Sequence, residues 1–271
     1  MPYREKRYIA GQYQYIDIFP VTQLEVKSPR GEKTKISSPK QRALNDKNAK
    51  RHLAMLVNTN FTDDDLVSHL TYDQDHLPAS PEEAMRDVTN FIRRIKTARK
   101  RKALPDLKYI AVVEYRDPED SKPGVRIHHH IIMSGGLSRD EVERIWKKGR
   151  CNTDRLQADE AGYEGLARYI SKDPRGSKRW CQSKNLKQPE VHVNDFKYSR
   201  KRVEQLARCP GERELFESLY PGYTLTTVTP EVNEISGGTY IYIKMRRRPD
   251  PARKEVRRGQ TRKRDPALLS G

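Results

Sequence analysis

Two apolar runs separated by a short polar segment set the strongest limit on the fold. Residues 107–117 (LKYIAVVEYRD) and residues 125–133 (VRIHHHIIM) are each typical of a strand, and PEDSKPG between them is typical of a turn. Strands joined by so few residues pair as an antiparallel hairpin. The isoleucines around the three histidines indicate that the second strand is largely buried. The chain is therefore expected to build its sheet around this hairpin.

Other segments add helices to the hairpin. Apolar residues recur at helical spacing in residues 41–60 and 81–101, and shorter helices are expected over 138–148 and 159–173. Ser80 with Glu83, and Ser138 with Glu141, match the capping-box pattern at two helix starts. Residues 65–72 are typical of a further strand. The mixture predicts an α+β fold, with a central antiparallel sheet of about five strands and flanking helices.

The histidine run is a candidate metal site. Side chains alternate along a strand, so His128 and His130 share one face and His129 points to the other. If the turn centres near residues 120 and 121, Glu114 lies roughly opposite His128. Two imidazoles and a carboxylate suit Mg²⁺ or Mn²⁺, with imidazole favouring Mn²⁺. The alternative is that the histidines hydrogen-bond within the core and Glu114 caps the hairpin.

A tyrosine on the expected helix at 159–173 is a candidate nucleophile. Tyr169 and Lys172 are three residues apart and so share a helix face. A lysine beside a phenol favours the phenolate, or stabilises charge that develops on a phosphate. Alone, the pair is also compatible with an ordinary solvent-exposed face. Tyr163 lies about 240° around the helix from Tyr169 and is expected in the core.

The charge balance points to a polyanionic partner. The chain has 54 Lys and Arg residues against 37 Asp and Glu residues, a formal charge of +17. Such an excess favours nucleic acid as the partner. Residues 251–271 are rich in arginine, poor in large apolar residues, and expected to form a disordered basic tail. The sequence shows neither a secretory signal nor an apolar run of membrane-spanning length, so a cytoplasmic location is expected.

Basic and aromatic residues in two further places suit DNA. The helix at 81–101 carries Arg93, Arg94, Lys96, Arg99 and Lys100. Beyond Tyr169 follow Arg175, Lys178, Arg179 and Trp180. The indole of Trp180 either stacks on an unpaired base or packs in the core. The acidic runs TDDD (62–65) and YDQDH (72–76) are expected to serve as loop and cap residues.

Taken in order, these motifs resemble those of the HUH endonucleases, in particular rolling-circle replication initiators of plasmid and phage type. The stretches that carry the resemblance are HLTYDQDHLP, LKYIAVVEYRD, RIHHHIIM, LARYISK and RWCQSKNLKQP, over about residues 41–200. The resemblance implies a five-stranded antiparallel sheet related to RNA-recognition folds. It also implies that Tyr169, helped by Lys172 and a metal ion on His128, His130 and Glu114, cleaves single-stranded DNA at an origin. The products would be a 5′-phosphotyrosine and a primer 3′-hydroxyl.

The resemblance also implies an organisation and partners. Residues 1–40 form an N-terminal strand and loop segment, 41–185 the nicking domain, 186–250 an extension that can bind DNA, and 251–271 the tail. No Walker-type phosphate loop is present in the sequence, so a host helicase and a polymerase are expected as partners. Tyr163 and Tyr169 depart from the two-tyrosine spacing of some branches, which leaves termination open. Alternatives are a relaxase or transposase of the same superfamily, or a non-catalytic DNA-binding regulator.

Overall fold

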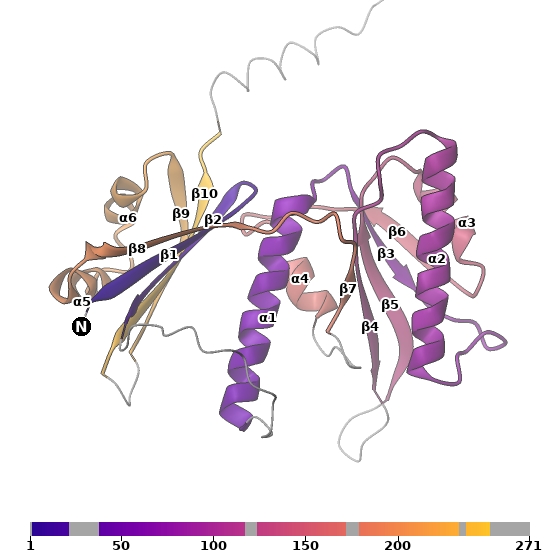
Figure 1. Ribbon diagram of the computed structural model, residues 1–271, viewed down its shortest axis with the longest axis horizontal. Helices are drawn as coiled ribbons and strands as arrows, with labels where there is room; N and C mark the ends of the chain where they lie inside the picture. Colours follow the sequence, from indigo (N-terminus) through magenta and orange to yellow (C-terminus); the bar gives the residue numbers. More distant parts are fainter. Residues whose placement is uncertain (1, 22–37, 117–123, 172–178, 233–236, 250–271) are drawn as a thin grey trace, which may run out of the picture.

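The computed structural model describes residues 2–21, 38–116, 124–171, 179–232 and 237–249 (Figure 1). They form an α+β fold, as the sequence predicts, but with two five-stranded antiparallel sheets where one was expected. The strand order is β8-β1-β2-β10-β9 in the first sheet and β6-β3-β5-β4-β7 in the second. We call these the outer sheet and the histidine sheet, because the second carries the three histidines.

The outer sheet joins the two ends of the described chain. Its strands are β1 (Tyr3–Ala10), β2 (Tyr13–Pro20), β8 (Glu190–Tyr198), β9 (Tyr223–Val232) and β10 (Thr239–Arg247). Helices α5 (Arg200–Arg208) and α6 (Arg213–Leu219) pack on one face over a core that includes Ile16, Phe216 and Ile241. The expected N-terminal segment and C-terminal extension therefore meet in a single sheet.

The histidine sheet is built around the predicted hairpin. Its strands are β3 (Leu66–Leu70), β4 (Tyr109–Arg116), β5 (Val125–Met133), β6 (Cys151–Arg155) and β7 (Cys181–Gln182). Strand β5 pairs with β4 on one side and β3 on the other, so it is the central strand. This position explains why the consecutive residues Ile131, Ile132 and Met133 are all apolar and buried, because a central strand covered by helices on both faces is buried on both.

Helices cover both faces of the histidine sheet. The helices on one face are α2 (Pro81–Arg101) and α3 (Arg139–Trp146), and those on the other are α1 (Pro39–Asn60) and α4 (Glu164–Ile170). Ser80 caps α2, and Ser138 with Glu141 forms the predicted capping box of α3. Phe91 of α2 is fully buried, and a side chain of that size contributes about 1.5–3 kcal/mol by burial.

Helix α1 lies between the two sheets (Figure 1). One side packs Leu53, Leu56 and Val57 toward the histidine sheet, while Met55 packs against tyrosines of the outer sheet. Arg51 of the same helix donates two hydrogen bonds to the carboxylate of Asp17 in β2. The layers therefore follow one another as α5 and α6, outer sheet, α1 and α4, histidine sheet, α2 and α3.

Helix α4 begins later than the spacing predicts. The expected helix covers 159–173, whereas the observed one is Glu164–Ile170, and residues 172–178 lie outside the described residues. Asp159 and Gly162 exchange backbone hydrogen bonds in a tight turn, and Gly162 has φ of +70°. A residue in that left-handed conformation does not continue a helix, so α4 starts after it. No described helix is both long and apolar enough to cross a membrane.

Candidate metal centre and tyrosine helix

Strand pairing brings three histidines and a glutamate together. His130 in β5 lies directly opposite His69 in β3, and His128 lies directly opposite Glu114 in β4. The predicted pairing of Glu114 with His128 is thus confirmed. Directly opposite residues in antiparallel strands point to the same face, and so do residues two apart in one strand. All four side chains therefore lie on the face that α1 and α4 cover.

The three imidazoles are close enough to hold one metal ion. One ring nitrogen from each of His69, His128 and His130 lies within 4.8 Å of the others. The rings of His69 and His130 are stacked, with centroids 4.8 Å apart. The Oε2 atom of Glu114 is 3.4 Å from the Nε2 atoms of both His128 and His130. The set offers up to three nitrogen ligands and one carboxylate.

Hydrogen bonding within the site fits a bound cation. Among the described residues, the Nε2 atoms of His69 and His130 are buried without a hydrogen-bond partner. Leaving a buried polar atom unpaired costs about 1–3 kcal/mol, and a cation on these nitrogens would remove that cost. His128 Nδ1 lies 2.8 Å from the carbonyl oxygen of Arg126 and donates to it, which leaves the Nε2 lone pair for a metal.

The environment keeps the rings of His69 and His130 neutral, which is the form that binds a metal. Burial, together with the neighbouring His69 and His128, lowers the pKa of His130 to about 3. Burial, His128 and the Arg150 guanidinium lower the pKa of His69 below its usual range. Both imidazoles are therefore unprotonated at neutral pH.

His129 has a structural role on the opposite face. Its side chain is fully buried, and its Nε2 atom is 2.8 Å from the hydroxyl of Tyr72. Its ring also lies edge-on to that of Trp146. The sequence prediction that His129 faces away from the metal site is thus confirmed.

His69 is the member of the cluster that sequence reasoning missed. It stands in the expected strand at 65–72, within the HLTY stretch. Its contribution depends on β3 pairing with β5, and those strands are separated by a long helix and by β4. A signal was present, since His69 is a potential metal ligand within an expected strand, but the register of that strand could not be derived locally.

Tyr169 lies beside the histidine cluster. Its ring centroid is 5.2 Å from that of His130, and its side chain is 61 % exposed. Tyr163, at the start of the same helix, is 5 % exposed and donates its hydroxyl to Asp63. The expectation that Tyr163 belongs to the core is therefore confirmed. Lys172 lies outside the described residues, so its place relative to Tyr169 stays a prediction.

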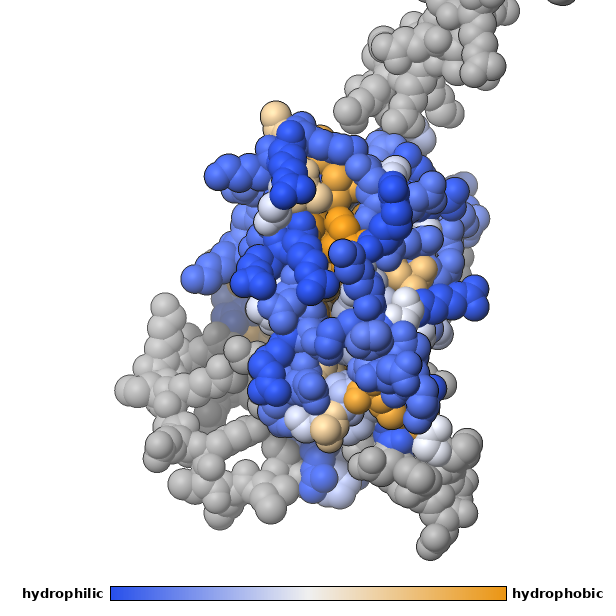
Figure 2. Space-filling model, turned by 90° about the vertical axis from the view of Figure 1, so that its right-hand side faces the viewer, coloured by the Kyte–Doolittle hydropathy of each residue, from blue (hydrophilic) through white to orange (hydrophobic). Residues whose placement is uncertain are grey.

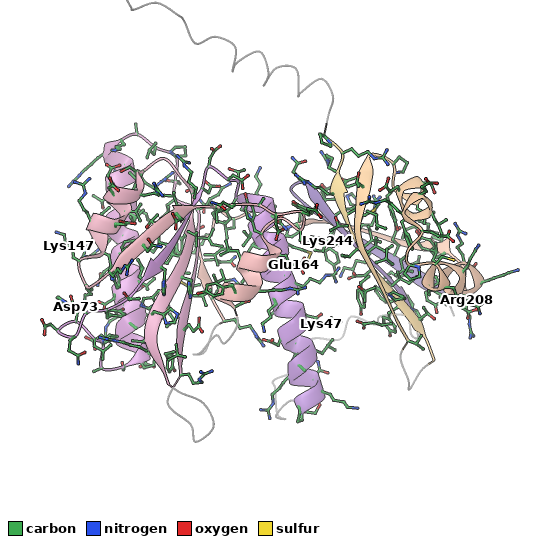
Figure 3. The ribbon with its side chains drawn as sticks, turned by 180° about the vertical axis from the view of Figure 1, so that it is seen from behind. Lys47, Asp73, Lys147, Glu164, Arg208 and Lys244 are labelled. Atoms are coloured by element: carbon green, nitrogen blue, oxygen red, sulfur yellow. The ribbon has the colours of Figure 1, made fainter. Side chains whose placement is uncertain are left out.

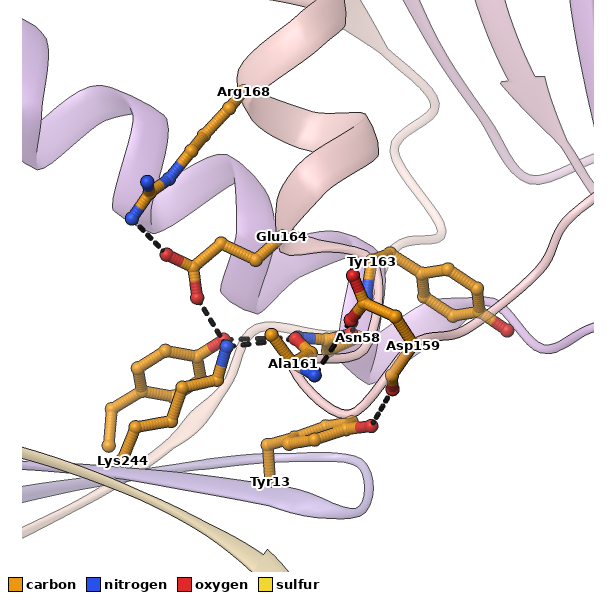
Figure 4. Close-up of polar contacts among 9 residues, drawn as sticks. Tyr13, Asn58, Asp159, Ala161, Tyr163, Glu164, Arg168 and Lys244 are labelled. Atoms are coloured by element: carbon orange, nitrogen blue, oxygen red, sulfur yellow. Dashed lines mark hydrogen bonds and ion pairs between the residues drawn. The ribbon is translucent and has the colours of Figure 1, made fainter. Parts of the chain in front are cut away.

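The outer sheet holds the start of the tyrosine helix in place (Figure 4). Lys244 of β10 donates to the carbonyl oxygen of Ala161 and to the carboxylate of Glu164. Tyr13 of β2 donates to the carbonyl oxygen of Asp159 at 3.2 Å. Figure 3 shows Lys244 and Glu164 meeting at the junction of the two halves. Helix α4 is thereby anchored from outside the sheet that carries the histidines.

Asn58 of α1 strengthens the same junction. Its Nδ2 atom donates to the hydroxyl of Tyr15 at 3.0 Å, and its Oδ1 atom accepts from the backbone N–H of Tyr163 at 3.0 Å. Gly162 is required there, because a Cβ atom would lie 2.5 Å from Asn58 Oδ1. One amide therefore ties α1, the outer sheet and α4 together.

The basic residues predicted to bind DNA fall into separate places. Arg179 forms an ion pair with Asp46 of α1. Trp180 is half-buried, stacks near His52 and donates to the side chain of Gln182 at 2.8 Å, so much of its ring packs against protein. Arg175 and Lys178 lie outside the described residues.

The back of the histidine sheet carries a basic groove. Arg93 and Arg94 line a 540 Å³ pocket between α2 and α3, with Ala98 and Ile145 among its apolar residues. Figure 2 looks onto this side, where hydrophilic side chains surround an exposed apolar strip. Arg99, expected among the basic residues of this helix, is instead 4 % exposed. It donates to the carbonyl oxygens of nearby loops and so holds them against α2.

The acidic runs act as loop and cap residues, as expected. Asp63 accepts hydrogen bonds from the backbone N–H of Ala158 and from the Tyr163 hydroxyl. Asp65 accepts from the backbone N–H groups of Thr62 and Gly135. These carboxylates are occupied within the fold.

Comparison with known proteins gives one match, to a protein-family model. A model of the family described as replication-associated protein ORF2/G2P matches residues 65–174. The matched segment runs from β3 to α4 and contains the histidine cluster, Glu114 and Tyr169. Neither the curated proteins nor the solved structures gave a significant match. The central part of the chain is therefore similar to replication-associated proteins of the ORF2/G2P family, and this similarity supports a replication-initiator type of protein.

Proposed function

We propose that this protein is a rolling-circle replication initiator that nicks and rejoins single-stranded DNA. The observation that carries the proposal is the position of Tyr169, an exposed phenol whose ring is 5.2 Å from that of His130 at a cluster able to hold a metal ion. The family similarity over residues 65–174 supports the same assignment. A helicase and a polymerase of the host would supply strand opening and synthesis.

The proposed chemistry is a transfer of phosphate to tyrosine. The Tyr169 oxygen forms a bond to phosphorus, and the bond from phosphorus to the 3′ oxygen of the preceding nucleotide breaks. That oxygen takes up a proton and becomes the 3′-hydroxyl primer, while the phenol proton leaves to solvent, which reaches this exposed side chain. Rejoining is the reverse transfer to a 3′-hydroxyl. Lys172 is proposed to stabilise the charge on phosphate.

His69, His128, His130 and Glu114 would hold the divalent ion. When bound, such an ion withdraws electron density from a phosphate oxygen and so assists attack at phosphorus. The presence of a third imidazole moves the preference from Mg²⁺ toward Mn²⁺, because Mg²⁺ strongly favours oxygen ligands. The neutral rings and the fixed Nε2 atom of His128 prepare the site for the ion.

A denaturing-gel assay for covalent adducts tests this proposal. The wild-type protein is mixed with single-stranded DNA from the region adjoining its gene and with Mn²⁺. We expect an adduct that EDTA prevents and that Tyr169→Phe abolishes. Tyr163→Phe is the matched control and keeps the adduct. An adduct that survives in Tyr169→Phe would refute the assigned nucleophile.

Relaxases and transposases of the same superfamily would use the same residues, so their distinction rests on the DNA that is cut. An origin-proximal cut with a free 3′-hydroxyl supports the initiator. DNA binding without any adduct would support a non-catalytic regulator instead.

A further inference from the structure

The edge strand β6 places two polar side chains beside the histidine cluster. Strand β6 pairs with β3, and Asn152 lies directly opposite His69. Cys151 and Thr153 face the other way, Cys151 against the α2 and α3 core and Thr153 in a hydrogen bond with Ser68. Because side chains alternate, Asn152 points to the face that carries the metal-binding histidines. The row of side chains across the sheet is thus Asn152, His69 and His130.

Arg150 extends this arrangement by one row. Its carbonyl oxygen accepts from the backbone N–H of Thr71 at 2.9 Å and from the Thr71 hydroxyl at 3.2 Å. Arg150 is two residues before Asn152 and so shares its face. The Arg150 guanidinium contributes, after burial and His128, to lowering the pKa of His69, as a cation on the same face would.

Gly149 makes this path of the chain possible. It has φ of +143°, a backbone conformation that side-chain-bearing residues rarely adopt. A Cβ atom there would lie 2.5 Å from the backbone nitrogen of Asp73 and 2.6 Å from the carbonyl oxygen of Thr71. The close approach that presents Arg150 therefore requires glycine.

Both side chains are available for a ligand. Arg150 and Asn152 are exposed, and neither side chain has a hydrogen bond or ion pair with any other residue that the structure describes. Many other arginines of the chain are engaged, for example Arg51 with Asp17 and Arg168 with Glu164. An exposed guanidinium beside a candidate phosphate-cleaving site has the geometry and charge to bind a phosphodiester.

We propose that Arg150 and Asn152 form a phosphate subsite that binds the phosphodiester next to the scissile one in single-stranded DNA. This proposal rests on the proposed function. Arg150 stands on the β6 side of the histidines, and Glu114 stands on the β4 side, where it is itself a candidate metal ligand. The guanidinium of Arg150 attracts a phosphate, so the nucleotide next to the scissile phosphodiester is expected to lie over β6.

The test measures DNA binding without catalysis. Fluorescence anisotropy follows a labelled, mixed-sequence single-stranded oligonucleotide in EDTA over a series of salt concentrations. The variants are Arg150→Ala, Arg150→Lys and Asn152→Ala. Arg155→Ala is the control, because Arg155 ends β6, is also exposed, and by alternation lies on the other face, where it donates to the carbonyl oxygen of Asp64. Circular dichroism melts confirm that each variant is folded.

We expect Arg150→Ala to weaken binding about fivefold and to lower the slope of log Kd against log salt by about 0.7, the value for one phosphate contact with a single strand. Arg150→Lys keeps the charge but not the two-pronged donor, so its loss is smaller. Asn152→Ala weakens binding without changing the salt slope. Equal losses in Arg150→Ala and Arg155→Ala would overturn the subsite, because only general charge would then be involved.

The adduct assay separates this proposal from the proposed function. If Arg150→Ala shows the expected binding loss but the wild type forms no adduct through Tyr169, the nicking function fails, and Arg150 and Asn152 remain a phosphate-binding site for single-stranded DNA without a neighbouring scissile bond. If the wild type forms the adduct but Arg150→Ala binds like Arg155→Ala, the nicking function stands and the subsite fails.

Discussion

The ion pair between Lys244 and Glu164 offers a quantitative test of how the outer sheet holds the tyrosine helix. We predict that Glu164→Gln destabilises the protein more than Lys244→Met does. The side chain of Lys244 is 7 % exposed, whereas that of Glu164 is 22 % exposed and has Arg168 as a second partner. Removing the Glu164 carboxylate therefore leaves the buried Lys244 ammonium without an ion-pair partner. Removing Lys244 leaves the Glu164 carboxylate still paired with Arg168.

The magnitudes follow from this asymmetry. Stranding one partner of a buried ion pair costs about 3–5 kcal/mol, and we expect about 3 kcal/mol for Glu164→Gln because the Ala161 carbonyl remains as an acceptor. For Lys244→Met we expect about 1–2 kcal/mol, because the ammonium also loses its contacts with the faces of the Tyr13 and Tyr15 rings, while methionine keeps a side chain of similar length and apolar character. Burial lowers the pKa of Lys244 despite the pairing, so desolvation offsets much of the attraction. The double variant is expected to be about as stable as Lys244→Met.

Urea unfolding provides the assay. Far-UV circular dichroism follows both sheets, whereas fluorescence follows the histidine-sheet side, because Trp146 and Trp180 both pack there. Arg168→Gln is the control, since its guanidinium is 70 % exposed and its loss should cost under about 1 kcal/mol. The reasoning fails if Glu164→Gln is no more destabilising than Arg168→Gln, or if Lys244→Met costs more than Glu164→Gln.

Four further outcomes are expected. Burial alone would raise the pKa of Glu164, but Lys244 and Arg168 together outweigh it and hold the pKa below the ordinary 4.5. The stabilisation is therefore present above pH 4.5 and lost as pH falls below it, and pH-dependent melts of Lys244→Met should be flatter there because one of the two cations is gone. His69→Ala should reduce Mn²⁺ affinity in calorimetry about as strongly as His130→Ala, and equal affinity in His69→Ala and wild type would remove His69 from the site. His130→Ala should abolish adduct formation while leaving binding to duplex DNA in gel shifts. Tyr72→Phe removes the hydrogen-bond partner of His129 Nε2 and should lower the free energy of unfolding in urea by about 1–3 kcal/mol. An unchanged urea midpoint would show that this hydrogen bond does not stabilise the fold.

Local signals were sufficient for the central hairpin and for the candidate metal ligands Glu114, His128 and His130 on one of its faces. Only eight residues separate β4 from β5 in the sequence, which limits the register, so Glu114 could be placed opposite His128 from spacing alone. The capping residues Ser80 and Ser138 marked helix starts for a similar reason, because a cap bonds within its own first turn. In each case the partners are near in sequence.

Long-range pairing explains what could not be predicted. His69 joins the cluster through the pairing of β3 with β5, and no residue near His69 specifies that partner. In the outer sheet, β1 pairs with β8 and β2 pairs with β10, both of which come after residue 189. All strands of the histidine sheet lie between these partners in the sequence. The start of α4 likewise depends on Asn58 and Lys244, which reach it from distant parts of the chain.

The closure of the outer sheet by its last strand has a consequence for biosynthesis. Strand β2 has β1 as one neighbour and β10 as the other, and β10 extends to Arg247. All strands of the histidine sheet lie within residues 66–182, so that half can assemble on a nascent chain while β1 and β2 still form an isolated hairpin. Such a hairpin is only marginally stable in water. Lys244 arrives with the final strand, so the tyrosine helix receives its anchor as one of the last events in folding.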